Sequence, residues 1–362
     1  MDHRYGIHPQ LMPYVMALTS HPFGLQGAHA EIRNVESGSI ITKREKNIGD
    51  RFLLIITYCA TKLMWQVLMC PHDLTEPPDF IMQDDFLANV DVRVIESQVP
   101  SLAHWQPTDP KCLLNVVLEL LQLYKQYQGD LLTLNQQSRL CFEYRALSCC
   151  LADPMEDLEI CVHYQSRVSF LTHLKIDFSK LPTPVPKQKY LILLLIELGE
   201  NTKNTVSLIK QAELDGVFGN IDLPELKADM ILVEYIHLLQ NYLQNRVDDV
   251  AERLNQRKTL YSLLYQAFEP SILNGDNIMF HSISFLLEVE GFYYVTLIEI
   301  PENFPKEQPK ITISSMRKHK PGQEIFVGLK SYNYSSEWNV RKIFKKMYDF
   351  MKKQAFLQYN KC

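Results

Sequence analysis

Hydrophobic positions in the first part of the chain change from a helical to an alternating pattern. The apolar run 11–18 predicts an N-terminal helix, and "RFLLIITYCATKLMWQVLMC" (51–70) predicts a hairpin with its turn around 60–62. The segment "CPHDLTEPPDFIM" (70–82) follows. Because proline lacks a backbone donor, we expect this segment to run extended along a surface rather than in a central strand, with Phe80 and Ile81 directed inward.

A helical period follows from Asp109. Asp109 and Pro110 supply an N-cap and a first-turn proline, and the pair Gly129-Asp130 predicts the end of the helix. A second helical run covers 134–150. The positions that define the first stripe are Leu113, Val117, Leu120 and Tyr124.

The middle of the chain is rich in strand-forming residues. Four β-rich runs, 158–164, 167–178, 189–198 and 205–211, are separated by turn residues and by a proline cluster at 182–186. A long helix is then predicted from about 225 to 268, and its stripe suits either an intramolecular core or a partner helix. The stripe consists of Leu232, Ile236, Leu239, Leu243, Val247, Val250 and Leu254.

The last part of the chain repeats the order found in the first. After Asn274-Gly275, two strand runs joined around Gly291 precede a second proline segment, "FPKEQPKITI" (304–313). An amphipathic helix ends the pattern, with Val340, Ile343, Phe344, Met347 and Phe350 on one side. The order of helix, hairpin, proline segment and helix near both ends predicts an internal repeat, with the middle region as a degenerate third copy.

Composition and charge narrow the function classes. The chain has 362 residues, 46% of them hydrophobic and 22% charged, which suits two or three globular domains. Its net charge of −5 does not require a nucleic acid or a membrane as partner, and no apolar run is long enough to cross a bilayer. The eight cysteines form no CxxC pair, which indicates reduced thiols in the cytoplasm or nucleus.

The candidate chemistry points away from catalysis. The histidines form no His-x-His pair and no HExxH motif, so no metal site and no cofactor are expected. Cys112 should lie in the first turn of a helix, where the helix dipole favours the thiolate, although packing of a buried thiol is the favoured interpretation. The pair Cys149-Cys150 is interpreted as a helix end.

Basic residues gather on the last predicted helix. They are typical of either a solvated face or a surface that binds an acidic protein partner. Nucleic acid is not favoured, because no aromatic residues that could stack on bases are interleaved with the charges. Lys342, Lys345 and Lys346 are the candidate partner-binding residues within the set Arg341, Lys342, Lys345, Lys346, Lys352 and Lys353. Trp105 and Trp338 are interpreted as core anchors.

Two motifs resemble the ubiquitin-conjugating fold and its inactive UEV and RWD variants. Pro77-Pro78-Asp79-Phe80 looks like the proline motif of that fold, and Trp105-Gln106-Pro107 looks like its Trp-x-Pro segment. Phe304, Pro305, Pro309 and Trp338 form a weaker second copy. In active enzymes a catalytic cysteine lies between the two motifs, but neither 80–105 nor 309–338 contains a cysteine. The resemblance therefore implies a pseudo-enzyme scaffold without its nucleophile.

Longer strings resemble the BRE (brain and reproductive organ-expressed protein) family. These are "GDRFLLIITY", "PPDFIM", "LAHWQPTDPKCLLNVVLELLQLY", "QSRLCFEYRAL" and "FPKEQPKITI…YNYSSEW". The loop between Pro71 and Pro77 is longer than the family's tight turn. The resemblance implies an α+β fold of tandem UEV/RWD-like domains joined by long helices. The expected domains are 1–130 (UEV-like), 131–224 (a helix and a degenerate β-rich domain) and 225–362 (the long helix and a UEV-like domain).

The same resemblance implies a non-catalytic scaffold in the BRISC deubiquitinase complex and the related nuclear BRCA-associated assembly of the DNA damage response. The implied partners are a JAMM-type metalloprotease, its Abraxas-type MPN partner and a MERIT-type accessory subunit, with ubiquitin chains as a further candidate. The implied location is cytoplasmic and nuclear, with no nucleic acid or membrane partner. Two alternatives remain open: a conjugating enzyme with a displaced cysteine, and a UEV adaptor for proline-rich peptides.

Overall fold

The computed structural model describes most of the chain. The described ranges are 6–38, 49–82, 84–88, 90–134, 138–163, 167–181, 192–199, 204–219, 221–315, 326–327 and 332–359. The chain divides into two compact units: the first comprises 1–175, 190–215 and 220–240, and the second 176–189, 216–219 and 241–362. The division into 1–130, 131–224 and 225–362 stays a prediction.

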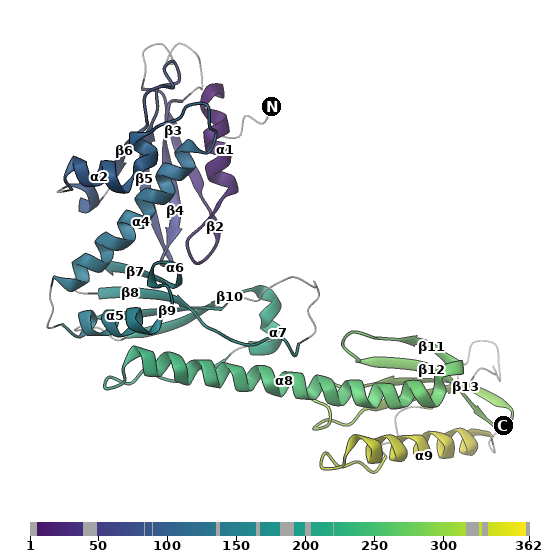
Figure 1. Ribbon diagram of the computed structural model, residues 1–362. Coiled ribbons are helices and arrows are strands. Elements are labelled where there is room, and N and C mark those ends of the chain that lie inside the picture. Colours follow the sequence, from purple (N-terminus) through teal and green to yellow (C-terminus); the bar gives the residue numbers. More distant parts are fainter. Residues whose placement is uncertain are drawn as a thin grey trace. The chain divides into compact units, whose positions relative to one another are not determined.

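The first sheet of unit 1 carries the N-terminal core. Its antiparallel order is β3 (Glu31–Glu36), β4 (Arg51–Tyr58), β5 (Thr61–Leu68) and β6 (Asp79–Met82). Helices α1 (Met12–Ser20) and α4 (Cys112–Thr133) pack on one face of this sheet (Figure 1), because alternate residues of β4 and β5 share a core with both helices. The short elements β1 (Pro22–Phe23), β2 (Ala28–His29), α2 (Val92–Gln98) and α3 (Pro100–Ala103) complete this part.

The proline segment joins the sheet as an edge strand. β6 pairs with β5, for example through Ile81 and Gln66. Pro77 and Pro78 precede the strand, so their lack of a backbone N–H removes no hydrogen bond between the strands. Phe80 packs against the core as expected. The inward direction predicted for Ile81 is wrong: its side chain is 53% exposed, because neighbouring residues of a strand face opposite sides of the sheet.

The predicted hairpin is confirmed, but its turn lies earlier than expected. β4 ends at Tyr58 and β5 begins at Thr61. Cys59 and Ala60 form the turn with φ of 46° and 58°. Two consecutive residues with positive φ are characteristic of the type I′ turn, whose twist matches that of the strands.

Helix α4 is longer than the sequence predicts. It begins at Cys112, and the Asp109 carboxylate accepts a hydrogen bond from the backbone N–H of Lys111 at 2.9 Å. The predicted break at Gly129-Asp130 is wrong, because the helix continues to Thr133. A Cβ on Gly129 would lie 2.8 Å from the Tyr144 Oη of α5 (Arg139–Cys150), so glycine here permits close helix packing instead of ending the helix.

A second antiparallel sheet confirms the β character of the middle region. Its order is β10 (Thr205–Lys210), β9 (Ile192–Gly199), β8 (Arg167–His173) and β7 (Leu158–His163). The short helices α6 (Pro154–Asp157) and α7 (Asp215–Phe218) flank these strands in sequence. The proline cluster at Pro182, Pro184 and Pro186 lies outside the described residues.

Helix α8 (Leu232–Phe268) confirms the long predicted helix but starts later than 225. At its start, the Glu143 carboxylate accepts a hydrogen bond from the backbone N–H of Leu232 at 2.8 Å. Most of the predicted stripe is buried, which favours a core over a partner helix. The buried members are Leu232, Leu239, Leu243, Val247 and Leu254, whereas Ile236 and Val250 are half-buried.

Unit 2 contains an antiparallel sheet and two helices that share one core. The strands, in spatial order, are β11 (Ile272–Gly275), β12 (Ser282–Val289), β13 (Phe292–Glu299), β14 (Lys310–Ser315) and β15 (Phe326–Val327). The C-terminal part of α8 and helix α9 (Val340–Tyr359) pack with the sheet (Figure 1). Asn274-Gly275, expected to precede the strands, belongs to β11 itself. The molecule is thus a mixed α and β protein with small antiparallel sheets.

Candidate interaction surfaces

The Trp-x-Pro segment is fixed to its neighbours by hydrogen bonds. Trp105 donates its ring N–H to the Leu74 carbonyl at 2.9 Å, which joins this segment to the proline-rich loop. Tyr14 of α1 donates its hydroxyl to the Pro107 carbonyl at 2.5 Å, and the rings of Tyr14 and Trp105 lie 6.0 Å apart. Trp105 is half-buried against the core, so its position is that of an anchor.

The proline motif borders a shallow pocket. Pro78 is buried and Pro77 is exposed. Pro77 lines a pocket of about 270 Å³ together with Asp50, Arg51, Cys70, His72 and Asp79. Acidic and basic side chains both line this pocket, so its charge does not select one class of ligand.

The second copy of the motif is also held by tyrosines. Phe304 is fully buried, and Pro305 follows it through a cis peptide bond. Tyr334 donates its hydroxyl to the Pro305 carbonyl, and Tyr332 donates to the Pro309 carbonyl at 3.5 Å. Tyrosine hydroxyls therefore satisfy carbonyls of the Trp-x-Pro segment in the first copy and of the proline segment in the second copy, which gives these residues a structural role.

The cysteine nearest the Trp-x-Pro segment is unsuited to nucleophilic chemistry. Cys112 is the first residue of α4, as predicted, but only 4% of it is exposed. Burial raises the pKa of its thiol to about 11, with a smaller contribution from the charge of Asp109. This agrees with the favoured interpretation of a packed thiol, because the loss of water outweighs any lowering at the helix N-terminus. Cys112 lines a pocket of about 290 Å³ with His104 and Asp109.

The remaining described cysteines are divided between the core and the surface. Cys59, Cys141 and Cys161 are buried, whereas Cys70 is exposed and Cys149 and Cys150 are exposed at the end of α5. Among the residues that the structure describes, no three His, Cys, Asp or Glu side chains gather at metal-binding distance. Within the same residues, no helix combines the length and apolarity needed to cross a bilayer.

A buried carboxylate links the two sheets of unit 1, and the sequence analysis missed it. Glu159 of β7 is fully buried and accepts hydrogen bonds from the backbone N–H groups of Cys59, at 2.6 Å, and Leu25, at 2.7 Å. Burial raises its pKa, while these two bonds and the charge of Lys125 act in the opposite direction. The only sequence signal is an acidic residue within the apolar run 158–163.

Two further polar contacts strengthen the same junction. Gln128 of α4 is buried and accepts a hydrogen bond from the Val162 N–H at 2.8 Å. The Tyr58 hydroxyl accepts one from the Ile160 N–H at 3.3 Å. Strand β7 therefore bonds to the first hairpin and to α4 through side chains, which makes unit 1 one compact body.

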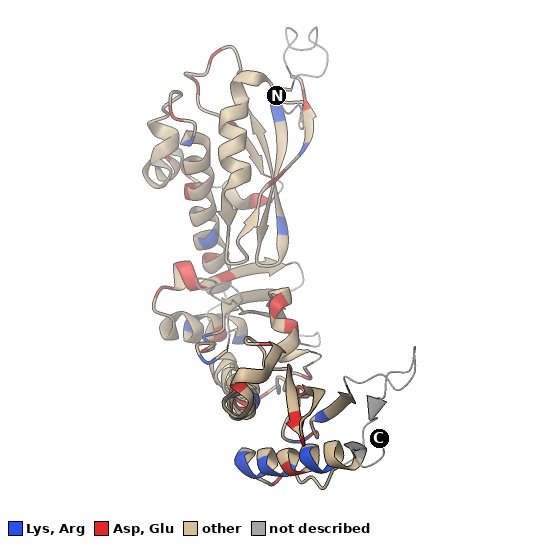
Figure 2. Ribbon diagram, turned by 90° about the vertical axis from the view of Figure 1, so that its right-hand side faces the viewer, with Lys and Arg blue, Asp and Glu red and all other residues tan. Residues whose placement is uncertain are grey.

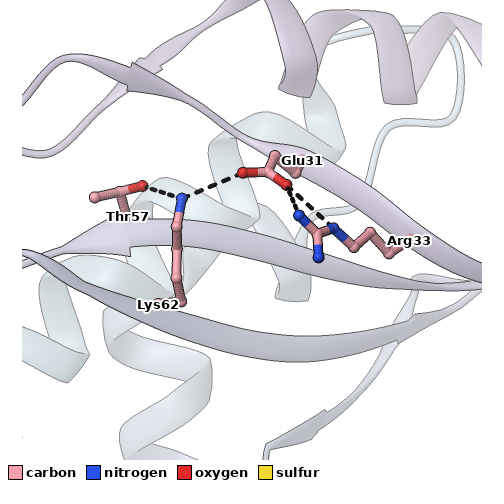
Figure 3. A network of polar contacts seen from close by, with 4 residues as sticks. All are labelled: Glu31, Arg33, Thr57 and Lys62. Carbon is pink, nitrogen blue, oxygen red and sulfur yellow. Dashed lines mark hydrogen bonds and ion pairs between the residues drawn. The ribbon is translucent and has the colours of Figure 1, made fainter.

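The outer face of the N-terminal sheet combines charged and apolar positions. Glu31 pairs with Arg33 at 2.5 Å and with Lys62 at 3.2 Å, and Lys62 also donates to the Thr57 hydroxyl at 2.8 Å (Figure 3). These contacts lower the pKa of Glu31, the Arg33 hydrogen bond most of all. Met64, paired across β4–β5 with Ile55, is 37% exposed on this face.

Helix α9 shows a row of basic residues in unit 2 (Figure 2). All six predicted basic positions are exposed, and Ile343 and Met347 are fully buried on the opposite side. Lys342 lies over the Trp338 ring, 4.6 Å from its centroid. The structure thus places all three candidate partner-binding lysines on one accessible surface, next to the tryptophan of the second motif.

Comparison with known proteins adds a family and two relatives. The model of the family described as "Brain and reproductive organ-expressed protein (BRE)" matches residues 5–318. A protein of Branchiostoma floridae named "BRISC and BRCA1-A complex member 2" is 29% identical over 352 residues, covering 92% of this chain and 90% of its own length. A protein of the same name from Danio rerio is 28% identical, covering 84% of this chain and 81% of its own length.

Proposed function

The chain belongs to the BRE family, and from this premise we propose that it is a non-catalytic scaffold subunit of a ubiquitin-specific deubiquitinase complex of the BRISC type. The names of the two relatives support membership in a complex of this kind. The observation that carries the non-catalytic role is the burial of Cys112, which raises the pKa of its thiol to about 11.

We infer that the scaffold bridges other subunits through separate surfaces. The proposed framework is a UEV-like fold in each end of the chain, supported by the tyrosine hydroxyls that hold the Trp-x-Pro segment at Pro107 and the second proline segment at Pro305. In this proposal one end contacts a JAMM-type metalloprotease with its Abraxas-type partner, and the other contacts a MERIT-type accessory subunit. A direct contact with ubiquitin chains and residence in both cytoplasm and nucleus complete the proposal.

Purification of the tagged full chain from its own cells tests the assembly role. We expect the chain to elute with a large complex that cleaves ubiquitin chains, and a zinc chelator to abolish the cleavage because the metal belongs to the protease partner. The control is the same purification from cells that express the tag alone. A full chain that elutes as a monomer without cleavage would contradict the proposal.

A thioester assay separates the scaffold from a conjugating enzyme with a displaced cysteine. Because burial raises the pKa of the Cys112 thiol to about 11, the thiolate is a small minority near neutral pH. We therefore expect ubiquitin charged by an activating enzyme to give no reducible adduct with the chain. The measurement is a non-reducing gel of the wild type beside Cys112→Ser, and an adduct that this substitution removes would refute the scaffold assignment.

A further inference from the structure

The basic residues of α9 lie on one face because of helical geometry. At about 100° per residue, the six residues occupy an arc of roughly 140°, whereas the buried residues of the helix lie on the other side. The basic set is Arg341, Lys342, Lys345, Lys346, Lys352 and Lys353, here called the basic face, and the buried set is Ile343, Met347, Met351 and Ala355. The buried side joins the core of unit 2, so the helix presents the basic face to a partner, with the exposed side chains of Phe356 and Leu357 beyond the C-terminal end of that face.

The charges of the basic face are not neutralised within the described chain. No acidic side chain of the described residues forms an ion pair with any of the six, whereas Lys62, Lys180 and Lys210 are paired elsewhere. Residues 341–353 carry six basic residues and Asp349 alone as an acid, a net +5 in a chain of net charge −5. The rest of the chain therefore carries −10, so α9 is a positive region in an otherwise acidic chain.

Aromatic rings orient two of the ammonium groups. Lys342 lies 4.6 Å from the centroid of the Trp338 ring, and Lys352 lies 4.6 Å from that of Tyr348. A cation held over a ring has fewer conformations to lose when it binds an anion. The basic face is thus partly preorganised rather than a set of freely moving lysines.

We propose that the basic face of α9 binds an acidic segment of a protein partner, one rich in Asp and Glu. Residues 341–353 span about 18 Å, the length of five or six extended residues. A continuous polyanion such as duplex DNA is disfavoured because Asp349 lies within the face, where a peptide can place an uncharged residue and a phosphate backbone cannot. A membrane is disfavoured because the apolar stripe of the helix is buried in the core, which leaves Phe356 and Leu357 as its exposed large apolar side chains among the described residues.

The inference concerns direct binding by the basic face, which is a separate property from the proposed assembly role. It can therefore be measured with the full chain alone. The probe is a fluorescein-labelled peptide of about 12 residues in which glutamate alternates with serine, measured by fluorescence anisotropy. We expect binding that weakens steadily between about 50 and 300 mM NaCl, as for exposed charges. Lys345→Glu/Lys346→Glu should lower the affinity about tenfold, because two attractive contacts become repulsive.

Two variants make the measurement specific to this face. Lys258→Glu/Lys306→Glu changes the net charge by the same amount at exposed positions of unit 2 outside α9, and it should leave the affinity within about twofold of the wild type. Asp349→Lys, which removes the single acid of the face, should raise the affinity. Circular dichroism of each variant checks that the fold is retained.

Four outcomes would overturn the proposal. They are the absence of peptide binding at low salt, equal losses in the two double variants, tighter binding of duplex DNA of similar charge, and tighter binding of vesicles of phosphatidylcholine with phosphatidylserine. The last two would assign the basic face to nucleic acid or to lipid instead. Binding of the peptide alone, lost selectively in Lys345→Glu/Lys346→Glu, supports the acidic protein segment.

Discussion

The carboxylate of Glu159 is held by backbone donors rather than by an ion pair within the described residues. Its two oxygens each accept one N–H, from Leu25 and from Cys59, in a site without exposure to water. A hydrogen bond from a buried neutral donor to a carboxylate is strong because no water competes with it. A single side chain therefore joins the β4–β5 turn to strand β7.

Glu159→Gln tests this role. An amide has one oxygen and one NH₂ group, so one backbone N–H would face another donor, and we expect the free energy of unfolding to fall by about 2–3 kcal/mol. Urea denaturation of the full chain measures the change. The matched control, Glu213→Gln at an exposed position, should stay within about 0.5 kcal/mol of the wild type. Equal midpoints for both variants would show that Glu159 contributes nothing to the junction.

At the scale of elements, glycine at position 129 lets α4 and α5 approach closely. Gly129 is buried in the interior of α4, and the Tyr144 hydroxyl occupies the space that a Cβ would need. Sequence reasoning interprets Gly-Asp as a helix end because glycine has low helix propensity. The interpretation failed because the reason for glycine here is a contact with another element, which no local pattern records.

A double-mutant cycle separates the helix propensity of residue 129 from its contact with Tyr144. Alanine is favoured over glycine in a helix by about 1 kcal/mol, but Gly129→Ala in the wild type should bring little or no gain, because its Cβ would lie 2.8 Å from the Tyr144 oxygen. In a Tyr144→Phe background the same substitution should stabilise the chain by about 1 kcal/mol. Thermal unfolding of the four proteins measures the coupling, and identical effects in both backgrounds would exclude the steric explanation.

At the scale of the whole molecule, the sequence predicted most elements but few of the contacts between them. Leu113, Val117, Leu120 and Tyr124 are all buried, because helical periodicity depends only on spacing. The basic face of α9 was predictable for the same reason. The Glu159 junction was not, because its donors lie 100 and 134 positions away in sequence. The burial of Cys112 was expected from the sequence, and its raised pKa follows from that burial.

Truncation tests the proposed division of labour between the units. A variant ending at residue 270 lacks β11–β15 and α9, so we expect it to lose the accessory subunit while the N-terminal core stays folded. Trp65 and Trp105 then remain as the only tryptophans, and Trp65 is 2% exposed in the core. Its fluorescence should stay blue-shifted and change cooperatively in urea. Co-precipitation with a MERIT-type subunit is the second measurement, and retained binding would contradict the division.

The interleaved sequence of the two units has a consequence for synthesis on the ribosome. Residues 176–181 leave the ribosome early but belong to unit 2, where the Asp177 N–H bonds to Gln244 and Lys180 pairs with Asp248 at 2.7 Å. These partners come 67 and 68 residues later. At about 5–20 residues per second, the segment waits roughly 3–14 s during translation for its partners. Unit 1 has all of its residues once position 240 has emerged, near the end of that interval, whereas unit 2 can be completed only after α9 has emerged.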